Sequence, residues 1–252
     1  CIEYSFKTSI KIGSGGLLEN EPYVTPSARQ YECVNGGVVD DMDMDGDGAS
    51  VGDTLCLAAN SADILIPEIN SMGAKKFVKG AKDADYIGSD LGVLGIGCTY
   101  PVDSALWRFR IFNPGNVTLT DATVVDIFPY IGDTGVQLTG TARESVWEPY
   151  LVEPIVAPSP NIEIFYSQSK NPCRPEINPE DETGCVDDWT TTPPADLSTV
   201  KAVKFDFANE DIEPAEEFWF DVKMLAPDSI EMSPGIAWNS MARNANEVPA
   251  QE

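Results

Sequence analysis

Apolar and polar residues alternate along several segments of the chain, and a period of two is typical of a strand with one buried face. The first such segment is 2–12, which ends at the glycine-rich stretch 13–16. The same alternation returns at 107–111, 118–126, 162–166, 203–207 and 217–224. Helical periodicity is almost absent, and 19 prolines and 20 glycines favour many loops. The pattern therefore predicts an all-β protein built from sandwiches.

The organisation of the chain changes near residues 70–73. Residues 1–71 are expected to form a small β-rich unit, and residues 72–252 an immunoglobulin-like β-sandwich of ordinary size. The segment 149–194 holds many of the prolines and predicts an insertion in that sandwich.

The chain carries 41 Asp and Glu against 16 Lys and Arg, for a formal net charge of −25. This excess argues against a nucleic-acid partner, because phosphate binding needs a basic surface. It also argues against binding to anionic membranes. No segment is apolar for long enough to cross a bilayer, so we expect no membrane insertion.

Six cysteines and no histidine restrict the chemistry of the chain. No Cys-x-x-Cys pair occurs, so a zinc site is not expected. The even count favours disulfides formed in an oxidising compartment, with free buried thiols as the alternative. We predict three pairs: Cys173–Cys185, which flank a loop rich in Pro, Asn and Glu; Cys33–Cys56, which bracket an aspartate run; and, by elimination, Cys1–Cys98.

That aspartate run, residues 40–48, is the densest chemical signal in the sequence. Carboxylates at positions 1, 3 and 5 with glycine at position 6 are typical of a calcium loop. Position 12 is Gly52 rather than glutamate, and an aspartate one place later is the candidate substitute. The alternative is a solvated acidic turn. The predicted Ca²⁺ ligands are Asp41, Asp43, Asp45, Asp47 and Asp53.

Three motifs resemble domains of bacterial cell-surface proteins. The segment 113–129, NPGNVTLTDATVVDIFP, resembles a hallmark of sandwich repeats in such proteins. GIAWNS at 235–240 resembles a signature of large actinobacterial wall-anchored adhesins, although Met241 stands where those usually have Phe. KFVKG at 76–80 resembles the first strand of the same domains. The resemblance covers about residues 74–252. It implies a secreted structural or adhesive domain of a stalk or filament, with neighbouring domains or subunits, or a host or glycan ligand, as partners.

The resemblance also implies a candidate covalent crosslink. Related sandwiches of Gram-positive surface proteins join a lysine of the first strand to an asparagine of the last strand, assisted by a buried acid. Here the matching residues are Lys76, Asn239 and Asp126. The reaction needs a neutral amine, hence an apolar pocket that lowers the lysine pKa. Strand position alone is poor evidence that three side chains meet. We therefore favour a simpler interpretation, in which Lys76 is a surface lysine, Asn239 a turn or capping amide and Asp126 a turn former at a strand end.

Two other function classes remain as alternatives. A calcium-dependent, lectin-like module would stack sugars on exposed rings, for which Trp147, Trp189 and Trp219 are candidates; these rings would otherwise cover loops or an interface. A glycoside-acting enzyme would need a carboxylate pair, which any acidic chain offers. The lack of histidine excludes Ser-His-Asp and Cys-His sites. We therefore expect a non-enzymatic bacterial surface domain stabilised by disulfides and calcium.

Millimolar calcium should raise the unfolding temperature, because an ion that binds only the folded state stabilises it by mass action. With a dissociation constant on the order of 10⁻⁴ to 10⁻³ M, about 10 mM calcium should add roughly 1–3 kcal/mol. Calorimetry with calcium and with a chelator measures the shift. Asp43→Asn should abolish it and Asp211→Asn, outside the run, should not. An unchanged melting temperature would contradict the calcium loop.

Overall fold

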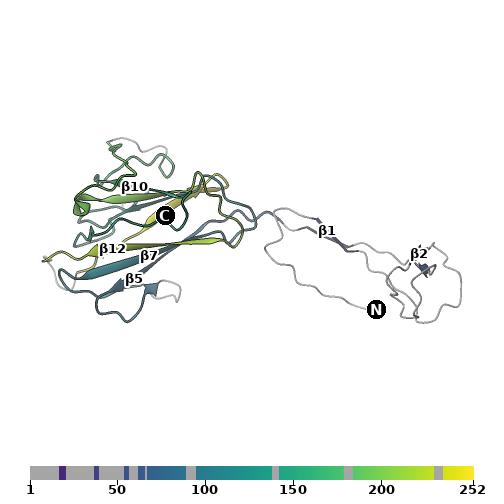
Figure 1. Cartoon of the computed structure of the whole chain (residues 1–252), viewed down its shortest axis with the longest axis horizontal. Helices are drawn as coiled ribbons and strands as arrows, with labels where there is room; N and C mark the ends of the chain where they lie inside the picture. The colour runs from purple at the N-terminus through teal and green to yellow at the C-terminus, as the bar shows by residue number, and fades with distance from the viewer. Residues whose placement is uncertain are drawn as a thin grey trace. The chain divides into compact units, whose positions relative to one another are not determined.

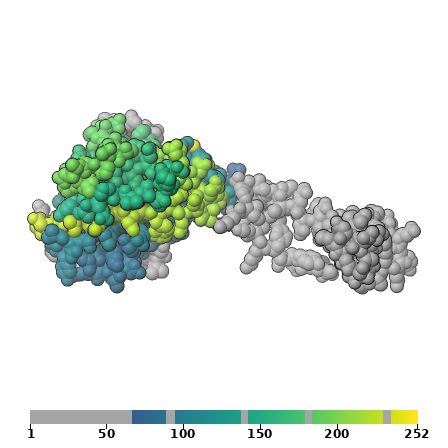
Figure 2. Space-filling model, viewed as in Figure 1, coloured from purple at the N-terminus to yellow at the C-terminus, as the bar shows by residue number. Residues whose placement is uncertain are grey.

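The computed structural model describes residues 67–88, 95–137, 142–178, 184–229 and 235–252, which are coloured in Figure 2, and the backbone of four short strands before them (Figure 1). The chain divides into two compact units, of which one is Ser14–Pro67 and the other contains Glu68–Glu252. The predicted strand at 2–12 and the aspartate run at 40–48 lie outside the described residues.

The smaller unit contains two pairs of antiparallel strands. One pair is β1 (Leu17–Asn20) with β4 (Ala62–Leu65). The other is β2 (Gly37–Val39) with β3 (Thr54–Cys56).

Five antiparallel strands form the first sheet of the larger unit, in the order β6-β5-β7-β12-β9. Buried and more exposed residues alternate along β7 and β12, as the two-residue period predicted. Phe109 on β7 lies opposite Phe220 on β12, so their side chains share the inner face. The strands are β5 (Gly73–Gly80), β6 (Ile87–Gly88), β7 (Ser104–Phe112), β9 (Tyr150–Leu151) and β12 (Glu217–Leu225).

The second sheet has the order β10-β11-β8-β13-β14. Its central strand is buried at all five positions, because Val124 joins the core between the sheets while Val125 and Ile127 pack beneath Val136 and Ile177 on the outside. A buried charge on this strand therefore has no direct route to water. The strands are β8 (Thr123–Ile127), β10 (Glu163–Ser167), β11 (Ala202–Asp206), β13 (Met241–Ala245) and β14 (Val248–Gln251).

The two sheets lie face to face as separate layers in Figure 1, with β5, β7 and β12 in one layer and β10 in the other. Aromatic rings fill the space between them. The centroid of the Phe205 ring lies 5.8 Å from that of Phe109 and 4.4 Å from that of Phe220. The only helical turn among the described residues is η2 (Leu197–Thr199). The predicted all-β sandwich is confirmed.

The strand predicted at 118–126 begins only at Thr123. The backbone of Asp121 has φ of 48°, which interrupts an extended conformation. Before it, the buried Asn113 holds the predicted turn together: its side chain accepts from Gly115 N and donates to the carbonyl oxygens of Val117 and Ile212. The apolar alternation of this segment therefore reflects a buried loop that leads into β8.

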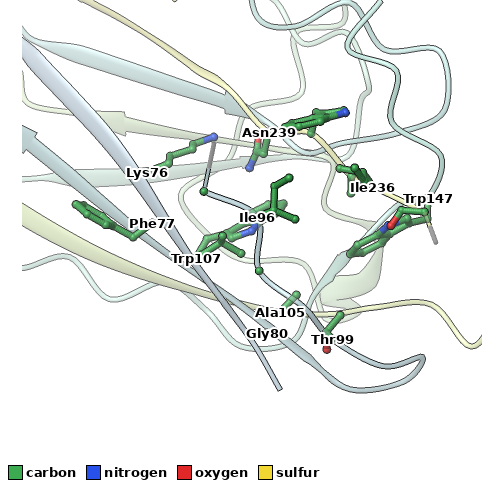
Figure 3. A pocket seen from close by; sticks show the side chains of 16 residues that line it. Lys76, Phe77, Gly80, Ile96, Thr99, Ala105, Trp107, Trp147, Ile236 and Asn239 are labelled. Carbon is green, nitrogen blue, oxygen red and sulfur yellow. The ribbon is translucent and has the colours of Figure 1, made fainter. Parts of the chain in front are cut away.

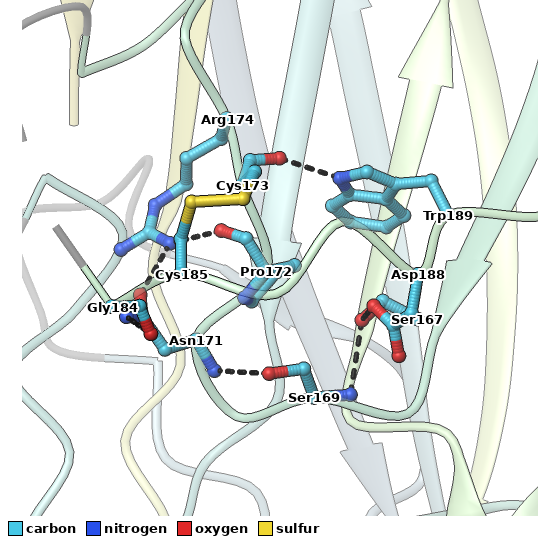
Figure 4. Close-up of a disulfide and its surroundings, with 10 residues drawn as sticks. All are labelled: Ser167, Ser169, Asn171, Pro172, Cys173, Arg174, Gly184, Cys185, Asp188 and Trp189. Atoms are coloured by element: carbon cyan, nitrogen blue, oxygen red, sulfur yellow. Dashed lines mark hydrogen bonds between the residues drawn. A yellow bond between two sulfur atoms is a disulfide. The ribbon is translucent and has the colours of Figure 1, made fainter. Parts of the chain in front are cut away.

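The predicted insertion at 149–194 is partly sandwich, because β9 and β10 lie within it. Its irregular part is closed by the predicted Cys173–Cys185 disulfide, whose Cα atoms are 4.8 Å apart (Figure 4). The Trp189 indole donates to Cys173 O at 2.6 Å, and Cys173 N donates to Val186 O at 3.0 Å. These contacts close the loop on itself, and the mutual backbone hydrogen bonds of Tyr166 and Thr190, at 2.8 and 3.0 Å, fasten its end to β10.

Removing this disulfide should cost about 3 kcal/mol of unfolding free energy, because the bond closes a loop with a sequence separation of 12 and restricts the unfolded chain. Urea denaturation of Cys173→Ala/Cys185→Ala measures the loss. Cys98→Ser is the control: it removes an exposed free thiol and should change stability by less than about 0.5 kcal/mol. Equal stability of the double variant and the parent would contradict the assignment.

Candidate functional site

Lys76 lies on the inner face of its strand, where a charged residue is unusual. It is paired across the strands with Phe109, which is fully buried. The Lys76 side chain is 15% exposed, and its Nζ atom lies 4.7 Å from the centre of the Phe109 ring and 6.0 Å from that of Trp107. The structure therefore contradicts the simpler interpretation of Lys76 as a surface lysine.

Asp126 meets this amine from the opposite sheet. It is the fourth residue of β8 and its side chain is 0% exposed. Lys76 Nζ lies 2.9 Å from Asp126 Oδ1 and donates a hydrogen bond to Ser240 O at 2.7 Å. The bond to Ser240 directs the amine, and Asp126 Oδ1 accepts no hydrogen bond of good geometry. The two sheets are thus joined here by a close but poorly directed polar contact.

Asn239 completes the group. It precedes β13, in which Met241 pairs with Asp126, and this register brings the asparagine beside the acid. Its Nδ2 atom donates to Asp126 Oδ2 at 3.2 Å. Ser145 holds the approaching segment by exchanging hydrogen bonds with the backbone of Trp238. One buried carboxyl group therefore contacts both an amine and a carboxamide.

An apolar pocket borders the group on one side (Figure 3). Lys76 and Asn239 lie at one end of it, and the amine points toward the asparagine side chain. Trp107, Trp147 and Ile96 line the rest. Such walls lower the local polarity around the amine, as the crosslinking chemistry requires.

Burial shifts the pKa values of both ionisable groups toward their neutral forms. It lowers the pKa of Lys76 from 10.5 to about 8, although the neighbouring Asp126 opposes this shift. Burial also raises the pKa of Asp126, opposed by Lys76 and Arg143. A neutral amine can attack a carbonyl carbon, and a protonated carboxyl can supply a proton to a leaving group. The arrangement therefore suits nucleophilic substitution at the Asn239 amide.

Arg143 is a neighbour that the sequence did not indicate. Its Nη1 atom lies 3.5 Å from Asn239 Oδ1 and donates to Ser240 Oγ at 3.1 Å. Its Nη2 atom donates to Ile127 O at 2.9 Å, and its Nε atom pairs with Asp133, which is 1% exposed. Arg143 lies in an irregular segment without periodicity, so no sequence pattern places it at this site.

The other predicted site residues have different outcomes. Cys98 is a free, exposed thiol, so its predicted pairing with Cys1 is wrong. That pairing rested on elimination alone, whereas the structure anchors Cys98 through its backbone: its N donates to Asp83 Oδ2 and its O accepts from Lys82 N. The other sites lie outside the residues whose side chains are described, and stay predictions: Cys33–Cys56, and Asp41, Asp43, Asp45, Asp47 and Asp53. Within the described ranges no three acidic or cysteine residues gather as a metal site.

The three candidate tryptophans occupy different surroundings. Trp147 and Trp189 are half-buried, and their indole nitrogens donate to the carbonyl oxygens of Gly235 and Cys173. Trp219 is 40% exposed on the outer face of β12, where its ring lies 5.7 Å from that of Phe77. Two of the three therefore hold loops in place through hydrogen bonds, and of the three only Trp219 exposes its ring to solvent.

Comparison with known proteins identifies no family. No family model matches the chain, and no curated protein matches it. Among solved structures, the CBM3a-L domain with flanking linkers from scaffoldin cipA of the cellulosome of Clostridium thermocellum matches at 10% identity and a TM-score of 0.30. The match covers 72% of this chain and 89% of that one. Within the described residues, no helix is both long and apolar enough to cross a membrane.

Proposed function

We propose that this protein is a structural module of a secreted bacterial surface protein, with its two sheets joined by an isopeptide bond between Lys76 and Asn239. The observation that supports it is that Asp126 contacts both partners, at 2.9 Å from Lys76 Nζ and 3.2 Å from Asn239 Nδ2. The disulfide agrees with an oxidising, extracellular compartment. In this proposal the partners are neighbouring domains or subunits of a fibre, and calcium binds the aspartate run.

The proposed reaction needs no external reagent. Lys76 Nζ, as a neutral amine, attacks Asn239 Cγ and forms a new carbon–nitrogen bond. Asp126 accepts a proton from Nζ and passes a proton to Nδ2. The Cγ–Nδ2 bond then breaks and Nδ2 leaves as ammonia. The products are one amide and one ammonia molecule, so atoms and charges balance.

The bond would stabilise the folded state mainly by restricting the conformations of the unfolded chain. It would close a loop of about 160 residues, and in the chain-entropy description of crosslinks this removes about 5 kcal/mol of unfolded-state entropy. It would also convert the buried Lys76 amine, which is costly to desolvate when charged, into a neutral amide, while Asp126 would remain as a buried acid. Both effects favour a module that resists unfolding in a fibre.

Intact mass spectrometry tests the bond. The folded protein should be lighter than its sequence, with the disulfide counted, by the mass of one ammonia molecule, and peptide mapping should join the peptides of Lys76 and Asn239. Lys76→Met and Asp126→Asn should keep the full mass, because one lacks the nucleophile and the other the proton acceptor. Lys79→Met is the matched control from the same strand, since Lys79 Nζ instead contacts Ala84 O. A full-mass, folded parent protein would refute the crosslink.

A second candidate function is glycan binding on the outer face of the first sheet. The observation that favours it is the exposed Trp219 ring beside the half-buried Phe77 ring, with an angle of 31° between the two planes. Beside them, Arg108 forms two hydrogen bonds with Asp221, at 2.6 and 2.9 Å. Rings offer stacking surfaces for sugars, and charged pairs offer partners for hydroxyl groups.

A glycan array tests this second function. If the face binds glycans, Trp219→Ala should weaken the retained signal about tenfold or more, because the stacking surface is lost. Val156→Ala removes an apolar side chain that is 81% exposed elsewhere and should leave the signal unchanged. A parent protein that retains no glycan, or an unchanged Trp219→Ala signal, would exclude this face as a lectin site.

A further inference from the structure

The two ends of the Asn239 carboxamide face different groups. Its Nδ2 atom, the leaving nitrogen of the proposed reaction, donates to Asp126 Oδ2 at 3.2 Å. Its Oδ1 atom instead faces Arg143 Nη1 at 3.5 Å. Asp126 is thus placed to exchange a proton with Asn239 Nδ2, and the Arg143 cation lies beside Asn239 Oδ1.

The Arg143 guanidinium is held from several sides. Nε pairs with Asp133, Nη2 donates to Ile127 O, and Nη1 donates to Ser240 Oγ. The Arg143 backbone N also donates to Asp133 O at 2.9 Å. The Arg143 side chain is 10% exposed and Asp133 1%, so neither is a mobile surface group. A guanidinium fixed this way needs little rearrangement to bind a charge that develops at Asn239 Oδ1.

Attack by Lys76 on Asn239 Cγ requires such a donor. As the new carbon–nitrogen bond forms, the electron pair of the carbonyl bond moves onto Oδ1, which becomes an oxyanion. Asp126 transfers the proton between the two nitrogens and contacts Nδ2, so another group must meet the oxygen. A distance of 3.5 Å is long for a hydrogen bond before reaction, and such contacts tighten as charge develops.

We propose that Arg143 is a catalytic residue of the crosslinking reaction, in which its Nη1 atom donates a hydrogen bond to the oxyanion at Asn239 Oδ1. This inference rests on the proposed bond between Lys76 and Asn239. The positive charge of Arg143 also lowers the pKa of Lys76, in the same direction as the larger effect of burial. Arg143 therefore favours both the neutral nucleophile and the charged intermediate.

The rate of ammonia loss tests the inference. Protein made in a short cell-free pulse is followed by time-resolved intact mass, and its folding by near-ultraviolet circular dichroism. Arg143→Met should fold and react about 100-fold more slowly, as expected for the loss of one oxyanion donor. Arg143→Lys should restore part of the rate, and millimolar guanidinium should accelerate Arg143→Ala. Arg243→Met is the matched control: Arg243 donates to Met72 O from β13, no bond joins it to Asn239, and the parent rate should persist.

The outcomes separate this inference from the proposed function. If the parent loses ammonia and a folded Arg143→Met reacts at the same rate, the role of Arg143 is overturned and the crosslink stands. If the parent never loses ammonia, the crosslink fails, and the inference fails with it. If Arg143→Met does not fold, Asp133→Asn/Arg143→Met decides, because it also removes the buried carboxylate that methionine would leave unpaired and it still lacks the donor. A folded double variant with the parent rate would likewise overturn the inference.

Discussion

The contact between Lys76 and Asp126 is the constraint on which the arrangement of the two sheets depends. Taking two opposite charges out of water costs several kcal/mol per ion, and this cost is recovered only with good geometry and further hydrogen bonds. Here one carboxylate oxygen lacks a well-directed bond. Transfer of the proton from the amine to the acid removes both charges, and both pKa shifts favour that neutral form. Burial in the core thus shifts both groups toward the neutral forms that the proposed reaction uses.

The position of this contact also determines which parts of the fold a Lys76–Asn239 bond would join. β5 lies in one sheet, while Asn239 leads into β13 of the other, so a bond between Lys76 and Asn239 would join the layers. The Cys173–Cys185 disulfide closes only a local loop. The proposed bond would therefore stabilise the whole sandwich, whereas the disulfide stabilises one loop, which Ile177 also ties to the second sheet. If a fibre is pulled through the chain before residue 76 and after residue 239, the bond would carry the force, and most of the sandwich between these residues would not.

The sequence predicts strands well where one face is apolar and the other polar. β7 and β12 follow this rule, and their alternation was enough to find them. β5 does not, since its inner positions include Lys76 and Gly80; the resemblance to surface domains indicated it, and periodicity did not. The resemblance to surface domains, with strand order, indicated Asp126, Lys76 and Asn239. Their contact depends on register and on the distance between sheets, which a sequence does not encode locally. Arg143 depends on the path of a loop and could not be predicted.

A site made from residues more than 100 positions apart exists only once the sandwich has formed. Holding the amine beside the carboxamide makes their reaction effectively unimolecular, which is worth several kcal/mol of its barrier. In the proposed reaction ammonia would then diffuse away, so the reverse reaction would lack a partner. The sandwich before crosslinking would consequently need only enough stability to hold the three groups together until they react. The proposed bond would then add to the modest equilibrium stability of the folded domain by restricting its unfolded chain.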